Sequence, residues 1–129
     1  MKSELIATWI DRGDRAREAA EHLLTTRPDF TDVAALLCHQ AAEKYLKALT
    51  MALDMSIART HNTTYLLDLL DDREEVPEDI YEAGETLEDY AAELTFPDEW
   101  TQPSPEEARQ AVELAGKIRE FVQQRLQNS

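Results

Sequence analysis

The chain has 129 residues, three Gly, five Pro and a net charge of −14, which favours one all-α domain over residues 1–129 and disfavours binding to nucleic-acid phosphates. Its single cysteine excludes an intrachain disulfide and a Cys-based zinc motif. No run approaches the ~20 apolar residues of a membrane span, so we expect a cytoplasmic protein that does not enter a membrane.

Two long amphipathic segments fill the N-terminal half. Apolar residues recur at helical spacing from Ser3, a predicted N-cap, to Thr25, where the following Arg-Pro pair stops the helix. A second helix is predicted from a cap at Asp29 or Thr31 to about Met55. Because its apolar positions cover more than half of the circumference, we expect this helix to be central to the core.

The next segment contains two further predicted helices. A short Leu-rich helix follows a cap at Thr60 or Asn62 and extends through Leu70. Pro77 suits the first turn of the following helix, whose apolar residues repeat every three or four positions to Leu94. Twelve carboxylates and one base lie between residues 68 and 93, which we interpret as a solvated acidic surface.

The last predicted helix has the clearest start. Ser104 is followed by Pro and, three positions later, by Glu107, which is the capping-box pattern, and the apolar stripe ends near Leu126. Residues 96–103 are predicted to form a loop before it. The expected fold is all-α, an up-and-down bundle of four main helices plus one short helix.

One edge of the predicted central helix carries polar side chains that a core helix does not need. They are His39, Gln40, Glu43, Lys44 and Lys47. The i,i+4 spacing of the first, third and fifth predicts a salt-bridged ladder. The alternative is a binding site in which the two lysines meet a nucleotide phosphate and the glutamine meets a base or a partner's backbone. His61 either fixes the connection that follows or faces the same ligand.

Four stretches of the chain form a recognisable combination. They are His39-Gln-Ala-Ala-Glu-Lys-Tyr-Leu-Lys-Ala-Leu49, Thr60-His61 with the Leu-rich segment after it, Tyr90 with Phe96-Pro97-Asp98, and Ser104-Pro-Glu-Glu-Ala108. Together they resemble the HEPN domain family (higher eukaryotes and prokaryotes nucleotide-binding). The resemblance implies a five-helix bundle, a homodimer and pairing with a minimal nucleotidyltransferase. It also implies one of two functions, a ribonuclease toxin or a non-catalytic binding protein.

Ribonuclease members of that family are similar in carrying an Arg, four to six residues and then a His on a helix after the second one. A His is needed to move a proton and an Arg to stabilise phosphorane charge. No His follows His61 here, and no Arg stands at the required distance before it. Arg17 and His22 have the literal spacing, but on the first helix and beside two glutamates.

The sequence therefore favours a non-catalytic HEPN-type homodimer that acts with a nucleotidyltransferase-type partner and binds a nucleotide at the polar edge. The alternative is a HEPN-type ribonuclease toxin of a toxin–antitoxin pair, with Arg17 and His22 as its catalytic residues. No cofactor or metal is expected, since no His has a Glu three residues before it as a di-metal carboxylate bundle requires. Thr63 departs from the family pattern, which often has an apolar residue after the Thr-His pair.

Overall fold

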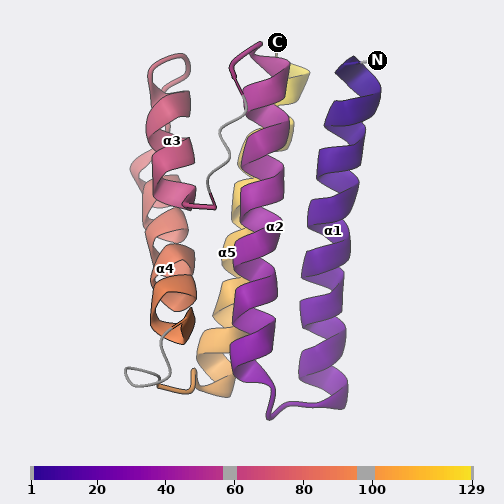
Figure 1. Ribbon diagram of the computed structural model, residues 1–129, viewed down its shortest axis with the longest axis vertical. Coiled ribbons are helices and arrows are strands. Elements are labelled where there is room, and N and C mark those ends of the chain that lie inside the picture. Colours follow the sequence, from indigo (N-terminus) through magenta and orange to yellow (C-terminus); the bar gives the residue numbers. More distant parts are fainter. Residues whose placement is uncertain (1, 57–60, 96–100, 129) are drawn as a thin grey trace.

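The computed structural model describes residues 2–56, 61–95 and 101–128, and in these ranges all regular secondary structure is helical. The helices are α1 (Lys2–Thr26), α2 (Thr31–Ala52), α3 (Thr63–Asp71), α4 (Glu78–Thr95) and α5 (Pro105–Gln127). Figure 1 shows α1, α2, α4 and α5 alternating in direction, with the short α3 packed beside α2 and α4. The predicted fold, an up-and-down bundle of four main helices plus one short helix, is confirmed.

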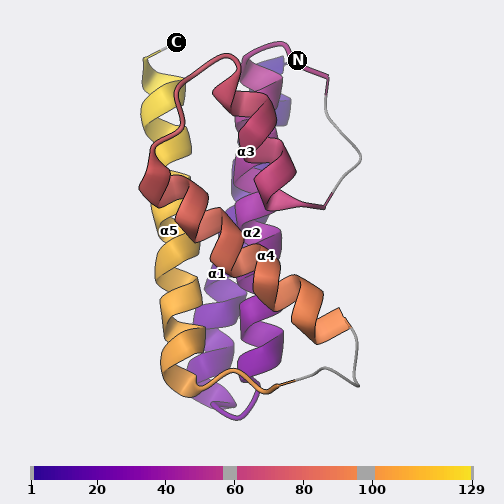
Figure 2. The same cartoon turned by 90° about the vertical axis from the view of Figure 1, so that its left-hand side faces the viewer.

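Helix α2 is the centre of the bundle, as its wide apolar surface predicts. It packs against each of the other four helices. Its fully buried side chains are mostly small, which lets neighbouring helices approach closely. They include Ala34, Ala35, Cys38, Ala41, Ala42 and Ala48. Figure 2 shows α4 crossing obliquely over α2 and α5 on one side of the bundle, with α3 beside it.

α2 begins within about one residue of its predicted start, but its capping differs from the prediction. Phe30 occupies the N-cap position and no side chain caps the helix. The hydroxyl of Thr31 instead donates to the carbonyl of Pro103 at 2.7 Å, and the amide of Gln102 donates to that hydroxyl at 2.7 Å. The hydroxyl of Thr31 therefore does not cap α2, because the segment that precedes α5 places a carbonyl oxygen within hydrogen-bond distance of it.

Other helix ends lie close to their predicted positions. The side chain of Asn62 caps α3 by accepting from the backbone N–H of Tyr65 at 2.9 Å, and Ser104 with Glu107 forms the predicted capping box. α4 begins one residue after Pro77. α2 ends at Ala52, three residues earlier than predicted. Ser3 lies inside α1, while Thr60 and residues 96–100 of the predicted loop lie outside the described residues.

Two helix pairs approach most closely at glycines. A Cβ built on Gly13 would lie 2.6 Å from the ring of Tyr45, and one built on Gly84 would lie 2.5 Å from Leu67. Gly13 thus permits the contact between α1 and α2, and Gly84 permits the contact between α4 and α3. Among the described residues, no helix is both long enough and apolar enough to cross a bilayer.

Candidate functional site

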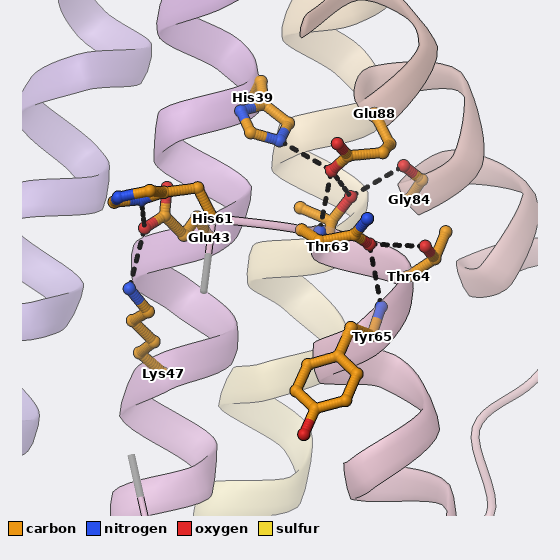
Figure 3. A network of polar contacts seen from close by, with 10 residues as sticks. His39, Glu43, Lys47, His61, Thr63, Thr64, Tyr65, Gly84 and Glu88 are labelled. Atoms are coloured by element: carbon orange, nitrogen blue, oxygen red, sulfur yellow. Dashed lines mark hydrogen bonds and ion pairs between the residues drawn. The ribbon is translucent and has the colours of Figure 1, made fainter. Parts of the chain in front are cut away.

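The polar edge of α2 is largely enclosed by the neighbouring elements. The carboxylate of Glu43, at 2% exposed, accepts at Oε2 from Lys47 Nζ at 2.7 Å and lies 2.7 Å from Nδ1 of His61 (Figure 3). Burial alone would raise the pKa of Glu43, but the hydrogen bonds from Lys47 and His61 outweigh it, so that pKa lies below its ordinary value. Lys47 is also buried, whereas the side chain of His61 is 79% exposed.

His39 belongs to a separate group of contacts around Glu88 of α4. Its Nε2 lies 2.9 Å from Oε1 of Glu88, which also accepts from the backbone N–H of Thr63 at 2.8 Å (Figure 3). The hydroxyl of Thr63 lies 2.9 Å from the carbonyl oxygen of Gly84 and 3.1 Å from the same carboxylate oxygen. Glu88 therefore joins α2, α3 and α4 through one oxygen atom.

These contacts divide the predicted i,i+4 ladder into two parts. The rung between Glu43 and Lys47 is present, but the rung between His39 and Glu43 is replaced by the contact from His39 to Glu88. The reason is tertiary: a carboxylate from α4 reaches His39, and the loop before α3 delivers His61 to Glu43. Neither contact can be predicted from the spacing of residues along one helix.

The two remaining residues of the predicted edge are more accessible. Gln40 is exposed and Lys44 is half-buried. The ammonium groups of Lys44 and Lys47 each lie 5.7 Å from the ring centroid of Trp9 on α1, within the range of a cation–π interaction. The accessible polar groups of the edge are thus Gln40, Lys44 and the imidazole of His61.

A second polar cluster joins α1, α2 and α5. The hydroxyl of Tyr45 donates to Asp14 at 2.5 Å, and Arg119 donates to both carboxylate oxygens of Asp14, at 2.7 and 3.2 Å. Arg17 donates to the oxygen of Tyr45 at 3.2 Å. Hydrogen bonds from Arg119 and Tyr45 outweigh the effect of burial and lower the pKa of Asp14, while burial and the bond to Asp14 raise the pKa of Tyr45 to about 12.

Sequence reasoning missed Glu88, Asp14 and Arg119. Glu88 is one of twelve carboxylates in residues 68–93, and nothing in its spacing distinguishes it from its exposed neighbours. Asp14 and Arg119 are 105 residues apart, so only the packing of α1 against α5 brings them together. Tyr45 carried a usable signal, since a phenol on the apolar side of a core helix needs a polar partner for its hydroxyl.

Most of the chain matches the model of one protein family. The model of the HEPN domain matches residues 6–126. The chain belongs to the HEPN domain family. A search of curated protein sequences found no match to this chain.

Three solved structures share this HEPN fold. A protein from Thermus thermophilus has 29% sequence identity and a TM-score of 0.82, with 92% of this chain and 96% of that chain covered. A HEPN domain protein from Thermotoga maritima has 27% identity and a TM-score of 0.79, covering 95% and 99%. An archaeal HEPN homologue has 21% identity and a TM-score of 0.77, covering 94% and 97%, and supports the fold alone.

In this HEPN domain, the side chains of Arg17 and His22 extend from different sides of α1. Five residues along an α-helix rotate the side chain by about 140°, so the two project from different sides. Arg17 turns inward to Tyr45 and also bonds Glu21 at 3.3 Å, while His22 is exposed. In the described parts of this chain, no cluster of three or more His, Cys, Asp or Glu residues is placed to hold a metal.

Proposed function

We propose that this protein is a cytoplasmic, homodimeric, non-catalytic HEPN-domain protein that acts with a minimal nucleotidyltransferase-type partner. The observation that carries the proposal is the environment of the three histidines. His39 and His61 each contact a carboxylate, and His22 projects away from Arg17. A metal-independent ribonuclease needs an imidazole and a cation directed at one phosphate. Arg17 instead donates to Tyr45 and Glu21, and His22 is exposed.

The accessible part of the polar edge supports a binding role. Gln40 and Lys44 on α2 and His61 just before α3 offer an amide, an ammonium group and an imidazole to a ligand or partner. Glu43 and Lys47 lie behind them and hold the imidazole in place. An imidazole that is held by a buried partner loses little side-chain entropy on binding. We assign the contact with the partner protein, or with a nucleotide that the partner presents, to this edge.

Membership in the HEPN family supports the identity of the partner and the homodimer. The charge of the chain supports a protein or nucleotide ligand over RNA, because a net charge of −14 opposes a long polyanion far more than one small anion. Of the two lysines, Lys44 is the one available for a phosphate. Lys47 is already neutralised by Glu43 at 2.7 Å.

The first experiment tests the partner. The minimal nucleotidyltransferase encoded nearest to this gene is co-expressed with the wild type, with Gln40→Ala/Lys44→Ala, and with the matched control Gln110→Ala/Lys117→Ala on α5. Co-purification with the wild type and the control, but not with the first variant, is expected. Equal recovery with all three would remove the assignment of the partner contact to the polar edge.

The second experiment tests the nucleotide. Calorimetry with ATP is performed on the wild type, on Lys44→Ala and on the control Lys117→Ala. Heat that disappears only in Lys44→Ala is expected. The absence of heat in the wild type would eliminate free nucleotide as a ligand and leave the partner protein as the only occupant.

The alternative function is a ribonuclease toxin that uses Arg17 and His22, and only their spacing favours it. Purified wild type, His22→Ala and His61→Ala are incubated with structured and single-stranded RNA. No cleavage by any of the three is expected. Cleavage by the wild type that is lost in His22→Ala and retained in His61→Ala would overturn the non-catalytic proposal.

A further inference from the structure

α1 and α5 are the least closely packed of the helix pairs that touch one another, and we refer to their junction as the seam. α1 packs chiefly on α2 and touches α5 much less. A hollow of about 510 Å³, bordered by Arg17, Leu24, Arg109 and Gly116, lies toward one end of the seam. Two more, of about 360 and 490 Å³, lie toward the other end around the first turns of α1. The bridge between Asp14 and Arg119 separates the two ends.

Apolar side chains line this seam without being fully covered. They are Ile6, Ile10, Leu24, Val112 and Leu126, each of intermediate exposure. A line of half-covered aliphatic groups that follows two helices, with polar residues at its margins, is typical of a surface that another helix covers.

Charge selects the kind of occupant. α1 and α5 together carry eight bases and nine carboxylates, so this side of the molecule is almost neutral. The α3 and α4 side, with twelve carboxylates and one base in residues 68–93, would strongly repel a second copy. In a two-fold symmetric dimer the same surface meets itself, so the nearly neutral side of α1 and α5 tolerates that pairing better than the acidic side of α3 and α4.

Two unpaired side chains at the margin provide complementary contacts. Arg109 and Glu113 border the larger hollow, and neither forms an ion pair with a described residue of its own chain. Each can therefore pair with the opposite charge on a second copy. α1 and α5 are each about 35 Å long, and a two-helix surface about 20 Å wide offers roughly 700 Å² per copy, close to the ~800 Å² of a standard interface.

We propose that the seam between α1 and α5 is the surface through which two copies of this chain associate, with Arg109 of each copy paired to Glu113 of the other. The inference rests on the homodimer of the proposed function and specifies its interface. The polar edge of α2, which that function reserves for the partner, is left accessible by this arrangement.

The test measures the dimer dissociation constant of the full chain by sedimentation equilibrium. Glu113→Arg is expected to raise it about tenfold or more, because two arginines then meet, and the charge swap Arg109→Glu/Glu113→Arg is expected to restore it to within about threefold. The control Glu85→Arg on α4 makes the same change in charge and should not raise it. Circular dichroism verifies that each variant is folded.

A second measurement uses the wild type alone. Methyl NMR spectra recorded above and below the dissociation constant should shift Ile6, Ile10 and Val112, and leave the buried Leu66 and Leu67 unmoved. A dimer that is unaffected by Glu113→Arg, and whose seam methyl signals do not shift, would overturn this interface while leaving the homodimer intact. A chain that is monomeric at all concentrations would overturn both.

Discussion

Glu43 and His61 form a contact between an almost completely buried carboxylate and an almost completely exposed imidazole, 2.7 Å apart. The same carboxylate oxygen neutralises Lys47. The exposed ring is therefore positioned by a charge pair in the interior, and the residues that hold it are distinct from the residues that a ligand or partner would touch.

Removal of either member of the buried pair should be costly. Glu43→Ala leaves the ammonium of Lys47 buried without its partner and is expected to lower the free energy of unfolding by about 3–5 kcal/mol. Replacing both together, as Glu43→Leu/Lys47→Met, removes both buried charges and should recover most of that loss. Urea unfolding of the wild type, Glu43→Ala and the double variant provides the measurement. A double variant that is no more stable than Glu43→Ala would contradict this account.

Acid should weaken the fold through the same carboxylate. The pKa of Glu43 is lowered in the folded protein from an ordinary value of 4.5, so its contribution to stability is complete above that pH and is lost as the pH falls through the folded pKa. Protonation of other carboxylates relieves repulsion in this acidic chain. The informative quantity is therefore the difference in the free energy of unfolding between the wild type and Glu43→Gln. That difference should shrink when unfolding is measured at successively lower pH below about 4.5. A difference that is constant from pH 7 to pH 3 would disprove the linkage.

The three glycines predict three different outcomes on substitution by alanine. Gly13→Ala forces a Cβ to within 2.6 Å of the Tyr45 ring, whose hydroxyl is held by Asp14, and should destabilise by about 1–3 kcal/mol. In Gly84→Ala the new Cβ meets the flexible end of the Leu67 side chain, so the loss of stability should be smaller. Gly116→Ala has only Arg17 Nη1 at 3.9 Å and should gain about 0.5–1 kcal/mol of helix propensity. Thermal unfolding gives the order, and a stabilised Gly13→Ala would refute the described α1–α2 packing.

The hydroxyl of Tyr45 should contribute measurably to stability. Tyr45→Phe removes a hydrogen bond to the ionised Asp14 and is expected to cost about 1.5–3 kcal/mol, although Arg119 still holds the carboxylate. Tyr65→Phe is the matched control, because Tyr65 is 48% exposed. Chemical denaturation compares the two, and equal effects would argue against the Tyr45 contact.

Detachment of α3 should follow from loss of its contact with α4. Thr63→Val keeps the backbone N–H bond to Glu88 but removes a buried hydroxyl, leaving the carbonyl of Gly84 without this donor. The expected cost is about 1–3 kcal/mol. Hydrogen exchange should accelerate in α3 before α5 is affected, and uniform acceleration over all helices would show that α3 does not open locally.

Most of the fold could be predicted from the sequence because its determinants are local. The spacing of apolar residues defines all five helices, and the Ser104 capping box and the Asn62 cap lie within three residues of the N–H groups that they satisfy. The position of the start of α2 could be predicted, but the absence of a side-chain cap could not, because the hydroxyl of Thr31 donates to a carbonyl 72 residues away.

The candidate site was only partly predictable for the same reason. Glu43 and Lys47 pair along one helix, so their spacing is sufficient. The partner of His39 on α4 and the approach of His61 to Glu43 depend on how helices pack and where a connection returns. Spacing also placed Lys44 and Lys47 together as phosphate ligands, whereas burial distinguishes them: Lys47 is enclosed and Lys44 is half-buried.

The contact between Thr31 and Pro103 has a consequence for the nascent chain. Synthesis of the 72 residues that separate them takes roughly 4–14 s at about 5–20 residues per second. During that interval the hydroxyl of Thr31 has only water or transient neighbours as partners. The side-chain contact that ties the start of the central helix to the segment before α5 therefore forms only after the ribosome has delivered that segment.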